Sequence, residues 1–318
     1  MENIAILTGG DSSEYDISIL SALNVLKNID KSKFRCVIVH LKNGTYKTDD
    51  NSIIDLKDFS YCSSNIKYKI DKVFIALHGP PAENGQIQDY FDSIKLPYTS
   101  CNAKISALTF NKFHCNQILQ KNGFKCAKSL LITNQDNIVE ENIIKQIGLP
   151  YIVKPNSAGS SHGITVITEK NQLKKAMSIA REHSENVILE SFIKGRELSC
   201  GIYFDGDEIK ALPITEIITD NLFFDYEAKY EGASKEITPA NISIELTHKI
   251  QNESIKIYSK MQLSGLCRID YIIKDNEAFV IEINTIPGLS EKSIIPQQIE
   301  KAKISLKEIF NLCLNNIN

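Results

Sequence analysis

Apolar and polar positions switch between strand and helix spacing along the first hundred residues. Short apolar runs at residues 4–7, 36–41 and 72–77 have the length of buried strands, and residues 17–26 have helical spacing. Strands that alternate with helices are typical of a parallel sheet whose faces are covered by helices. The pattern therefore predicts an N-terminal parallel α/β subdomain, which we assign to residues 1–98.

The spacing in the rest of the chain predicts two mixed α+β subdomains, over residues 99–188 and 189–318. The elements expected in the first are helices at 104–122 and 171–183 and strands at 151–154, 164–167 and 187–190. Strands and hairpins dominate the second, up to a final helix at 305–314. Its polar and aromatic stretch 220–238 is predicted to be a lid, because a loop of that length inside a domain usually has such a role.

Composition and charge exclude several classes of function. The 318 residues are 42% hydrophobic and carry a formal net charge of −3, which is typical of a soluble globular protein. Basic residues are scattered and outnumbered by acidic ones, so no nucleic acid partner is expected. No long apolar segment follows the N-terminus, so we expect a cytoplasmic protein without a membrane span. The eight cysteines lack a C-x-x-C pair and are expected to be reduced thiols.

The strongest chemical signal is a hairpin near the C-terminus. Two strand-like runs flank the turn-rich triplet 275–277. With this triplet as the loop, Asp270 lies opposite Glu282, and alternation places Arg268 and Asn284 on the same face. The opposite face would be a core layer formed by Ile269, Tyr271, Ile273, Phe279, Ile281 and Ile283.

Two carboxylates that face each other require a compensating charge. At about 5 Å and an effective dielectric near 20 they repel by roughly 3 kcal/mol. Oxygen ligands from Asp, Glu and Asn suit Mg²⁺, which completes its shell with water and nucleotide phosphates. Arg268 would then stabilise charge that develops during phosphoryl transfer. A solvated hairpin face with one arginine–carboxylate pair explains this segment equally well when it is taken alone.

Two further segments could bind a nucleotide. The strand that ends in Lys154 continues into a Gly/Ser loop at 156–163, whose N–H and hydroxyl groups suit a phosphate. Farther along, Glu190 and Glu197 flank a glycine turn and could accept hydrogen bonds from a ribose or an adenine amino group. Taken alone, the first segment is also an ordinary hairpin turn and the second a surface turn with solvated acids.

Together these motifs resemble the ATP-grasp fold, in which two α+β subdomains hold ATP between them, and specifically the D-alanine–D-alanine ligase family. The resemblance covers essentially the whole chain. Its most specific stretches are residues 9–14, 78–79 with 83–85, 154–163, 224–230 and 282–288. The chain departs from the usual family pattern at Ala82 and Asn84, where glycine and aspartate are common, and at Asn111, where aspartate is common. The geometry near the first substrate could shift as a result.

The resemblance implies a role for each matching residue. Residues implied to bind ATP are Lys112, Lys154, Ser161, Glu190, Phe192, Ile193, Glu197, Lys229 and Ile281. Ligands implied for two Mg²⁺ or Mn²⁺ ions are Asp270, Glu282 and Asn284. Catalytic roles are implied for Glu14, Ser160, Tyr230, Arg268 and Gly288, and substrate contacts for His78, Ser293 and Ile294. From the sequence alone, Glu14 reads better as part of a capping box with Asp11, and a histidine that ends a strand is more often structural.

The implied reaction joins two D-alanine molecules for peptidoglycan precursor synthesis. The first carboxylate attacks the γ-phosphate of ATP, and the amine of the second D-alanine then displaces phosphate from the acyl phosphate. Tyr230 favours an amine as the second substrate, and a homodimer is implied by resemblance only. Two alternatives stay open: a ligase for another D-amino acid or a D-hydroxy acid, and an inactive ATP-binding regulatory module.

Overall fold

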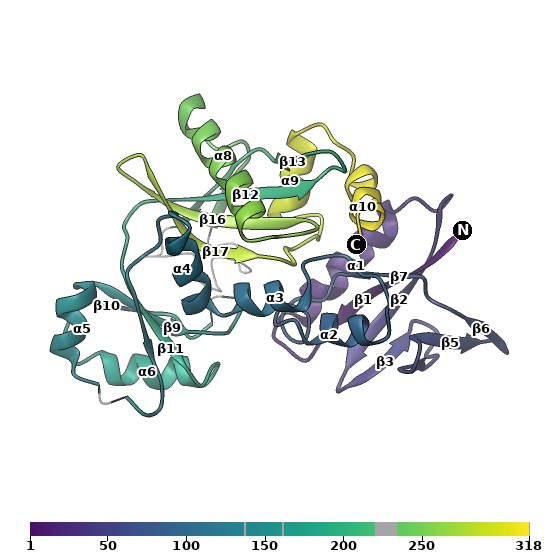
Figure 1. Ribbon diagram of the computed structural model, residues 1–318, viewed down its shortest axis with the longest axis horizontal. Coiled ribbons are helices and arrows are strands. Elements are labelled where there is room, and N and C mark those ends of the chain that lie inside the picture. Colours follow the sequence, from purple (N-terminus) through teal and green to yellow (C-terminus); the bar gives the residue numbers. More distant parts are fainter. Residues whose placement is uncertain (137, 161, 220–233, 318) are drawn as a thin grey trace.

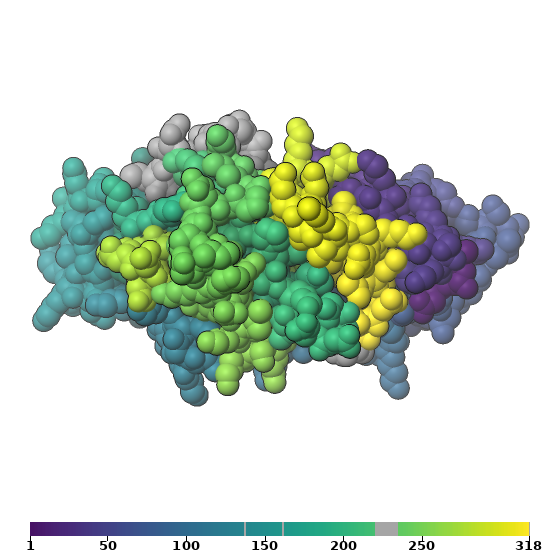
Figure 2. All heavy atoms as spheres, turned by 90° about the horizontal axis from the view of Figure 1, so that it is seen from above, coloured from purple at the N-terminus to yellow at the C-terminus, as the bar shows by residue number. Residues whose placement is uncertain are grey.

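The computed structural model describes residues 1–136, 138–160, 162–219 and 234–317. The molecule is elongated, with the N-terminal residues at one end and the strands and helices around residues 130–190 at the other (Figure 1). Figure 2 shows the C-terminal third, in green and yellow, between these two ends. Within the described ranges, no helix has the length and apolar character needed to cross a bilayer.

The N-terminal region is built on a sheet in the order β3–β2–β1–β7. Strand β1 (Glu2–Gly9) runs parallel to both β2 (Phe34–Lys42) and β7 (Lys72–Ile75), while β3 (Thr45–Thr48) is antiparallel to β2. Helix α1 (Tyr15–Asn28) packs against β1. The predicted parallel α/β unit at the N-terminus is thereby confirmed as a fold class.

Strand β1 is apolar along its length because both of its faces are covered. Ile4 and Ile6 pack with α1 and the C-terminal helices, whereas Ala5 and Leu7 pack in a second cluster on the other face. A small antiparallel sheet beside this unit is not predicted by the spacing, because its strands are very short. These strands are β4 (Ile54–Asp55), β5 (Ser60–Ser63) and β6 (Ile66–Tyr68).

The helical segment expected at 104–122 is two helices, and that expectation is corrected. After α2 (Gln86–Ser93), helix α3 (Ala103–Phe110) ends at Asn111, which has φ −85° and ψ 95°. The Asn111 side chain accepts a hydrogen bond from the His114 backbone N–H and so caps α4 (Lys112–Lys121). The break places Lys112 at the first residue of a helix.

The central region is an antiparallel sheet in the order β10–β9–β11–β8, and α6 packs against β9. Strand β8 and helix α5 are not predicted by the spacing. The elements here are β8 (Ser129–Ile132), α5 (Glu140–Ile147), β9 (Tyr151–Pro155), β10 (Thr165–Ile167), α6 (Leu173–Arg181) and β11 (Val187–Ser191).

The C-terminal sheet has the order β15–β14–β12–β16–β17, with β13 also paired to β12. Its strands are β12 (Arg196–Phe204), β13 (Ile209–Ala211), β14 (Thr215–Thr219), β15 (Ser234–Ile237), β16 (Cys267–Lys274) and β17 (Glu277–Asn284), and its helices are α8 (Ile244–Lys260), α9 (Ile294–Lys301) and α10 (Leu306–Asn315). The expectation that strands and hairpins run up to one final helix is wrong, because α8 and α9 intervene. Of the predicted lid at 220–238, residues 220–233 lie outside the described residues and residues 234–237 form β15.

The β16–β17 hairpin has a tighter turn than predicted. Asp275 and Asn276 both have positive φ, so the turn is two residues long and Lys274 pairs with Glu277. A bulge next to Asp270 then restores the predicted pairing of Asp270 with Glu282. The predicted core positions of Phe279 and Ile281 are wrong for this reason. Ala278 and Val280 are buried in the core, whereas Phe279 and Ile281 line a cavity.

Candidate active site

Two neighbouring cavities contain every predicted site residue that the structure describes. The large cavity, of about 640 Å³, lies between the central and C-terminal sheets, and the small cavity, of about 320 Å³, lies between the N-terminal region and the segment from β17 to α9. They share Lys112, Ala158, Gly159 and Glu282. The large cavity is also lined by Lys154, Glu190, Phe192, Ile193, Glu197, Asp270 and Ile281, and the small one by Glu14, His78, Ser160, Arg268, Asn284, Gly288, Ser293 and Ile294. Ser161, Lys229 and Tyr230 lie outside the described residues.

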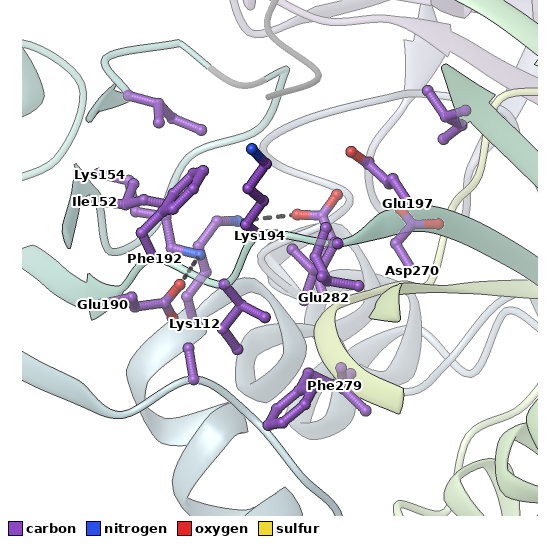
Figure 3. A pocket seen from close by; sticks show the side chains of 18 of the residues that line it. Lys112, Ile152, Lys154, Glu190, Phe192, Lys194, Glu197, Asp270, Phe279 and Glu282 are labelled. Atoms are coloured by element: carbon purple, nitrogen blue, oxygen red, sulfur yellow. Dashed lines mark hydrogen bonds and ion pairs between the residues drawn. The ribbon is translucent and has the colours of Figure 1, made fainter. Parts of the chain in front are cut away.

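One wall of the large cavity carries a buried ion pair. Lys154 Nζ on β9 lies 2.6 Å from Glu190 Oε2 on β11, and both side chains are more than nine-tenths buried. Asn116 on α4 donates a hydrogen bond of 2.7 Å to Glu190 Oε1. Figure 3 shows this pair on one side of the cavity and Glu197, Asp270 and Glu282 on the other. Two regions far apart in the sequence therefore face one space.

Lys112 connects the Gly/Ser loop to the C-terminal hairpin. Its Nζ donates to the Ala158 carbonyl at 3.0 Å and lies 3.4 Å from Glu282 Oε2. The start of α4 holds the same loop, because Lys112 N–H donates to the Asn156 carbonyl and Phe113 N–H donates to the Asn156 side chain. The ammonium group of Lys112 is thus held where the two cavities meet.

The polar face of the hairpin lines the cavities, as its geometry predicts. Asp270 is 4% exposed and its two carboxylate oxygens accept hydrogen bonds from Arg268, at 2.9 Å for Nε and 2.7 Å for Nη2. Glu282, directly opposite, has Lys112 as its cationic neighbour. The predicted arginine–carboxylate pair is present, but Asp270 is buried, so this is no solvated hairpin face.

The donor set fits a magnesium ion that binds together with a nucleotide. Asp270 and Glu282 supply carboxylate oxygens, and Asn284 follows on the same strand. Among the described residues, no group of three or more His, Cys, Asp or Glu side chains could hold an ion alone. Mg²⁺ typically takes one or two carboxylates and completes its shell with phosphate and water. These residues therefore suit an ion that is also bound by phosphate.

The Glu14 side chain lies close to Gly79 and Gly159. Its predicted role in a capping box is wrong. Its side chain makes no capping hydrogen bond to α1, and Asp11 Oδ1 instead accepts from Asn43 N–H. A Cβ atom on Gly159 would lie 3.0 Å from Glu14 Oε2, and one on Gly79 would lie 3.4 Å from it. The missing side chains let the carboxylate reach the Gly/Ser loop from the N-terminal region.

Ser160, the next residue in that loop, has φ 53° and is 8% exposed. Its hydroxyl oxygen is buried without a hydrogen-bond partner among the described residues. A backbone in the left-handed region is uncommon for serine and costs about 1–3 kcal/mol. A buried hydroxyl in such a conformation is suited to a ligand that enters the small cavity.

His78 has the partners of a structural histidine. Its side chain is buried, Nδ1 donates to the Ile286 carbonyl at 3.0 Å, and Nε2 lies 2.9 Å from Ser21 Oγ. Burial lowers the pKa of the imidazole, which favours the neutral ring that this hydrogen-bond network requires. The ring lines the small cavity, but its two nitrogens join the segment after β7 to α1 and to the segment after β17.

Glu83 is a cavity residue that the sequence does not single out. It lines the small cavity, and burial raises the pKa of its carboxyl to about 8, with a further contribution from the charge of Glu14. Carboxyls with such shifts are common at functional sites. An isolated glutamate in a loop has no spacing that could reveal this role, and the only signal was its place in the motif at 83–85.

Comparisons with known proteins point to one family. The family models described as D-ala D-ala ligase N-terminus and D-ala D-ala ligase C-terminus match residues 3–101 and 118–314. A D-alanine–D-alanine ligase of Flavobacterium johnsoniae is 46% identical over 98% of this chain and 97% of its own length.

Two solved structures have the same fold over nearly their whole length. The VanG D-Ala:D-Ser ligase of Enterococcus faecalis is 28% identical, with a TM-score of 0.86 over 99% of this chain and 98% of that one. The D-alanine–D-alanine ligase of Bacillus anthracis complexed with ATP is 25% identical, with a TM-score of 0.80 over 99% and 96%. The chain therefore belongs to the D-alanine–D-alanine ligase family.

Proposed function

We propose that this protein uses ATP to join two D-alanine molecules to D-alanyl-D-alanine through an acyl phosphate. The observation that carries the proposal is the junction of the two cavities at Lys112, Gly159 and Glu282. ATP in the large cavity can place its γ-phosphate at this junction, where a carboxylate bound in the small cavity can attack it.

The large cavity suits ATP along its length. Phe192, Ile193 and Ile281 offer apolar surface to the adenine, and Glu197 can accept hydrogen bonds from the ribose hydroxyls. Lys112 and Lys154 supply positive charge for the phosphates. Since Lys154 is paired with Glu190, phosphate binding competes with that ion pair. When Lys154 moves to the phosphates, Glu190 can accept a hydrogen bond from the adenine amino group.

Asp270, Glu282 and Asn284 would hold Mg²⁺ or Mn²⁺, two ions in all. When bound, the metal neutralises charge on the phosphoryl group that is transferred. Arg268 lies beside these residues and is directed by Asp270, so it can stabilise negative charge on the reacting carboxyl group. Gly288 lines the same small cavity as Arg268, and its backbone N–H would serve the same purpose.

The small cavity suits the two amino acids. Glu14 and Ser160 lie at its junction with the Gly/Ser loop and would orient the first D-alanine, with Tyr230 as their proposed third member. Ser293, through its hydroxyl, and Ile294, through its backbone N–H at the start of α9, would bind the carboxylate of the second D-alanine, because a helix start favours an anion. A homodimer and a cytoplasmic location belong to this proposal on family resemblance, and size-exclusion chromatography tests the first.

The second substrate is the point on which relatives differ, since one similar structure is a D-Ala:D-Ser ligase. The test is coupled ADP release with D-alanine alone and with D-alanine plus D-serine, other D-amino acids or D-lactate, followed by product masses. We expect D-alanyl-D-alanine as the main product. A mixed dipeptide or an ester as main product would indicate a ligase for another second substrate, and absence of ADP release with every acid would indicate a regulatory module.

A further inference from the structure

We propose that Ser199 and Gln298 are positioning residues that couple the start of α9 to the carboxylate of Asp270. The inference rests on the proposed function, because it concerns how a proposed metal ligand is held. Neither side chain lines either cavity, so both would act through other residues.

Ser199 fixes the orientation of Asp270 from the neighbouring strand. The two residues are direct partners in the β12–β16 register, and Ser199 Oγ donates a hydrogen bond of 2.6 Å to Asp270 Oδ1. Ser199 is fully buried. With Ser199 on Oδ1 and Arg268 bridging both oxygens, the carboxylate is held in one orientation in the wall of the large cavity. Partners behind a metal ligand hold it in the orientation that binding requires.

Gln298 in turn holds the β12 backbone around Ser199. Its Nε2 donates to the Ser199 carbonyl at 2.9 Å and to Thr215 Oγ1 at 3.0 Å, and its Oε1 accepts from Gly201 N–H at 2.9 Å. The amide is fully buried, and both of its donors and its acceptor are satisfied. A Cβ at position 201 would lie 2.5 Å from Gln298 Oε1, so the glycine permits this approach.

The helix that carries Gln298 begins in the small cavity. Ile294 is the first residue of α9 and Gln298 follows four residues later, so both lie on one face of the helix. A shift of the helix start on binding the second amino acid would therefore move the Gln298 amide, and with it the backbone of Ser199. A fully satisfied buried polar network transmits such shifts because any broken member leaves an unpaired group.

The test measures metal binding directly as well as turnover. Mn²⁺ binding is titrated by electron paramagnetic resonance in the presence of the non-hydrolysable analogue AMP-PNP, for wild type, Ser199→Ala and Ser199→Thr. We expect Ser199→Ala to weaken Mn²⁺ binding about 10- to 100-fold, and Ser199→Thr, which keeps the hydroxyl, to stay within about threefold of wild type. If Ser199→Ala does not fold, Ser199→Cys, with a weaker donor, should bind Mn²⁺ measurably less well than wild type.

Gln298→Met tests the coupling to α9. This variant keeps the size of the side chain and loses its hydrogen bonds, and we expect it to raise the KM for the second D-alanine and to weaken Mn²⁺ binding together, each at least about threefold. The matched control is Ser254→Ala. Ser254 is another fully buried serine, whose hydroxyl pairs with the Tyr271 hydroxyl at 2.8 Å and lines neither cavity. It should lower the melting temperature and leave Mn²⁺ binding unchanged.

The outcomes separate this inference from the proposed function. Wild-type affinity for Mn²⁺ in folded Ser199→Ala, or a raised KM in Gln298→Met without any change in Mn²⁺ binding, would overturn the positioning role. Failure of wild type itself to bind Mn²⁺ with AMP-PNP would instead overturn the proposed function, and would be seen before any variant is compared.

Discussion

Lys154 and Glu190 form an ion pair across neighbouring antiparallel strands, with 2.6 Å between Nζ and Oε2, in the wall of the large cavity. They are offset by two residues in the register, since Lys154 pairs with Ile188 and Glu190 with Ile152. Because Asn116 donates a hydrogen bond to the other carboxylate oxygen, both oxygens of Glu190 have partners in the absence of nucleotide. Lys154 therefore stabilises the buried Glu190 carboxylate, and the proposed function gives it a second task in phosphate binding.

These two tasks can be separated by mutation. Lys154→Met leaves the Glu190 carboxylate buried without its cation, and we expect a loss of about 3–5 kcal/mol in the free energy of unfolding. The double variant Lys154→Met, Glu190→Gln removes both charges and should regain most of that loss, but it should not regain AMP-PNP binding. Urea unfolding and calorimetric titration measure the two properties. A double variant as unstable as the single one would contradict the assignment of the lost stability to an unpaired charge.

Glu282→Ala tests the metal assignment. The substitution removes a proposed ligand and leaves Lys112 with its hydrogen bond to the Ala158 carbonyl, so the fold should be preserved. We expect D-alanine-dependent ADP release to fall by at least about a thousandfold, because several kcal/mol of charge stabilisation are lost. The control is Glu277→Ala in the same hairpin, which removes only an exposed pair with Lys125. Normal turnover in folded Glu282→Ala would refute the metal role.

The predicted pairing of Asp270 with Glu282 is correct only because the bulge offsets the shorter turn, and the alternation of side chains then places Arg268 and Asn284 on the same face. The burial of the residues between the turn and the bulge could not be predicted. The two-residue turn and the bulge each shift the register by one position, and the two shifts cancel only beyond the bulge. Phe279 and Ile281 lie between these two shifts and so face the cavity. A hairpin sequence thus predicts its turn region more reliably than its turn length.

Helix α8 is absent from the predicted elements although its sequence carries a helix signal. Ser243 caps it by accepting from Leu246 N–H, and its buried residues Ile250, Ser254 and Ile257 have helical spacing. Contacts such as Lys112 with Glu282 and Ser199 with Asp270 join distant segments, and no local pattern predicts them. For Lys112 only the family resemblance supplied a role, and Ser199 became visible only in the structure.

Gly85 is required at the turn before α2. Its φ is 86°, and a Cβ there would lie 2.3 Å from the Ala103 carbonyl oxygen, so both conformation and space exclude a side chain. We expect Gly85→Ala to lose about 3 kcal/mol or more in the free energy of unfolding. Gly44→Ala is the matched control, because Gly44 also has positive φ but no atom within 4 Å of the added Cβ. It should lose only about 1 kcal/mol, and equal losses in the two variants would contradict the steric argument.

Glu83 should make the stability of the protein depend on pH. Its pKa of about 8 in the folded protein lies above the ordinary value of 4.5, mainly because of burial and secondly because of the Glu14 charge. The charge of Glu282 raises the pKa of Glu83 further. The charge of Lys112 and a hydrogen bond from the Gly79 backbone to the Glu83 carboxyl oppose the shift. A raised carboxyl pKa means that the folded state holds a proton that the unfolded chain releases. The stabilisation is therefore complete below about pH 4.5 and is lost as the pH rises through 8.

Glu83→Gln isolates this effect, because the amide resembles the protonated carboxyl and does not titrate. From pH 5 to pH 8.5 we expect the wild type to lose about 1–3 kcal/mol of unfolding free energy relative to the variant, less than the full shift implies because the side chain is only partly buried. Urea unfolding at several pH values measures the difference, and the exposed Glu141→Gln on α5 should run parallel to wild type. Parallel curves for Glu83→Gln as well would mean that Glu83 is ionised in the small cavity, and its carboxylate would then join Glu14 in repelling an incoming D-alanine carboxylate.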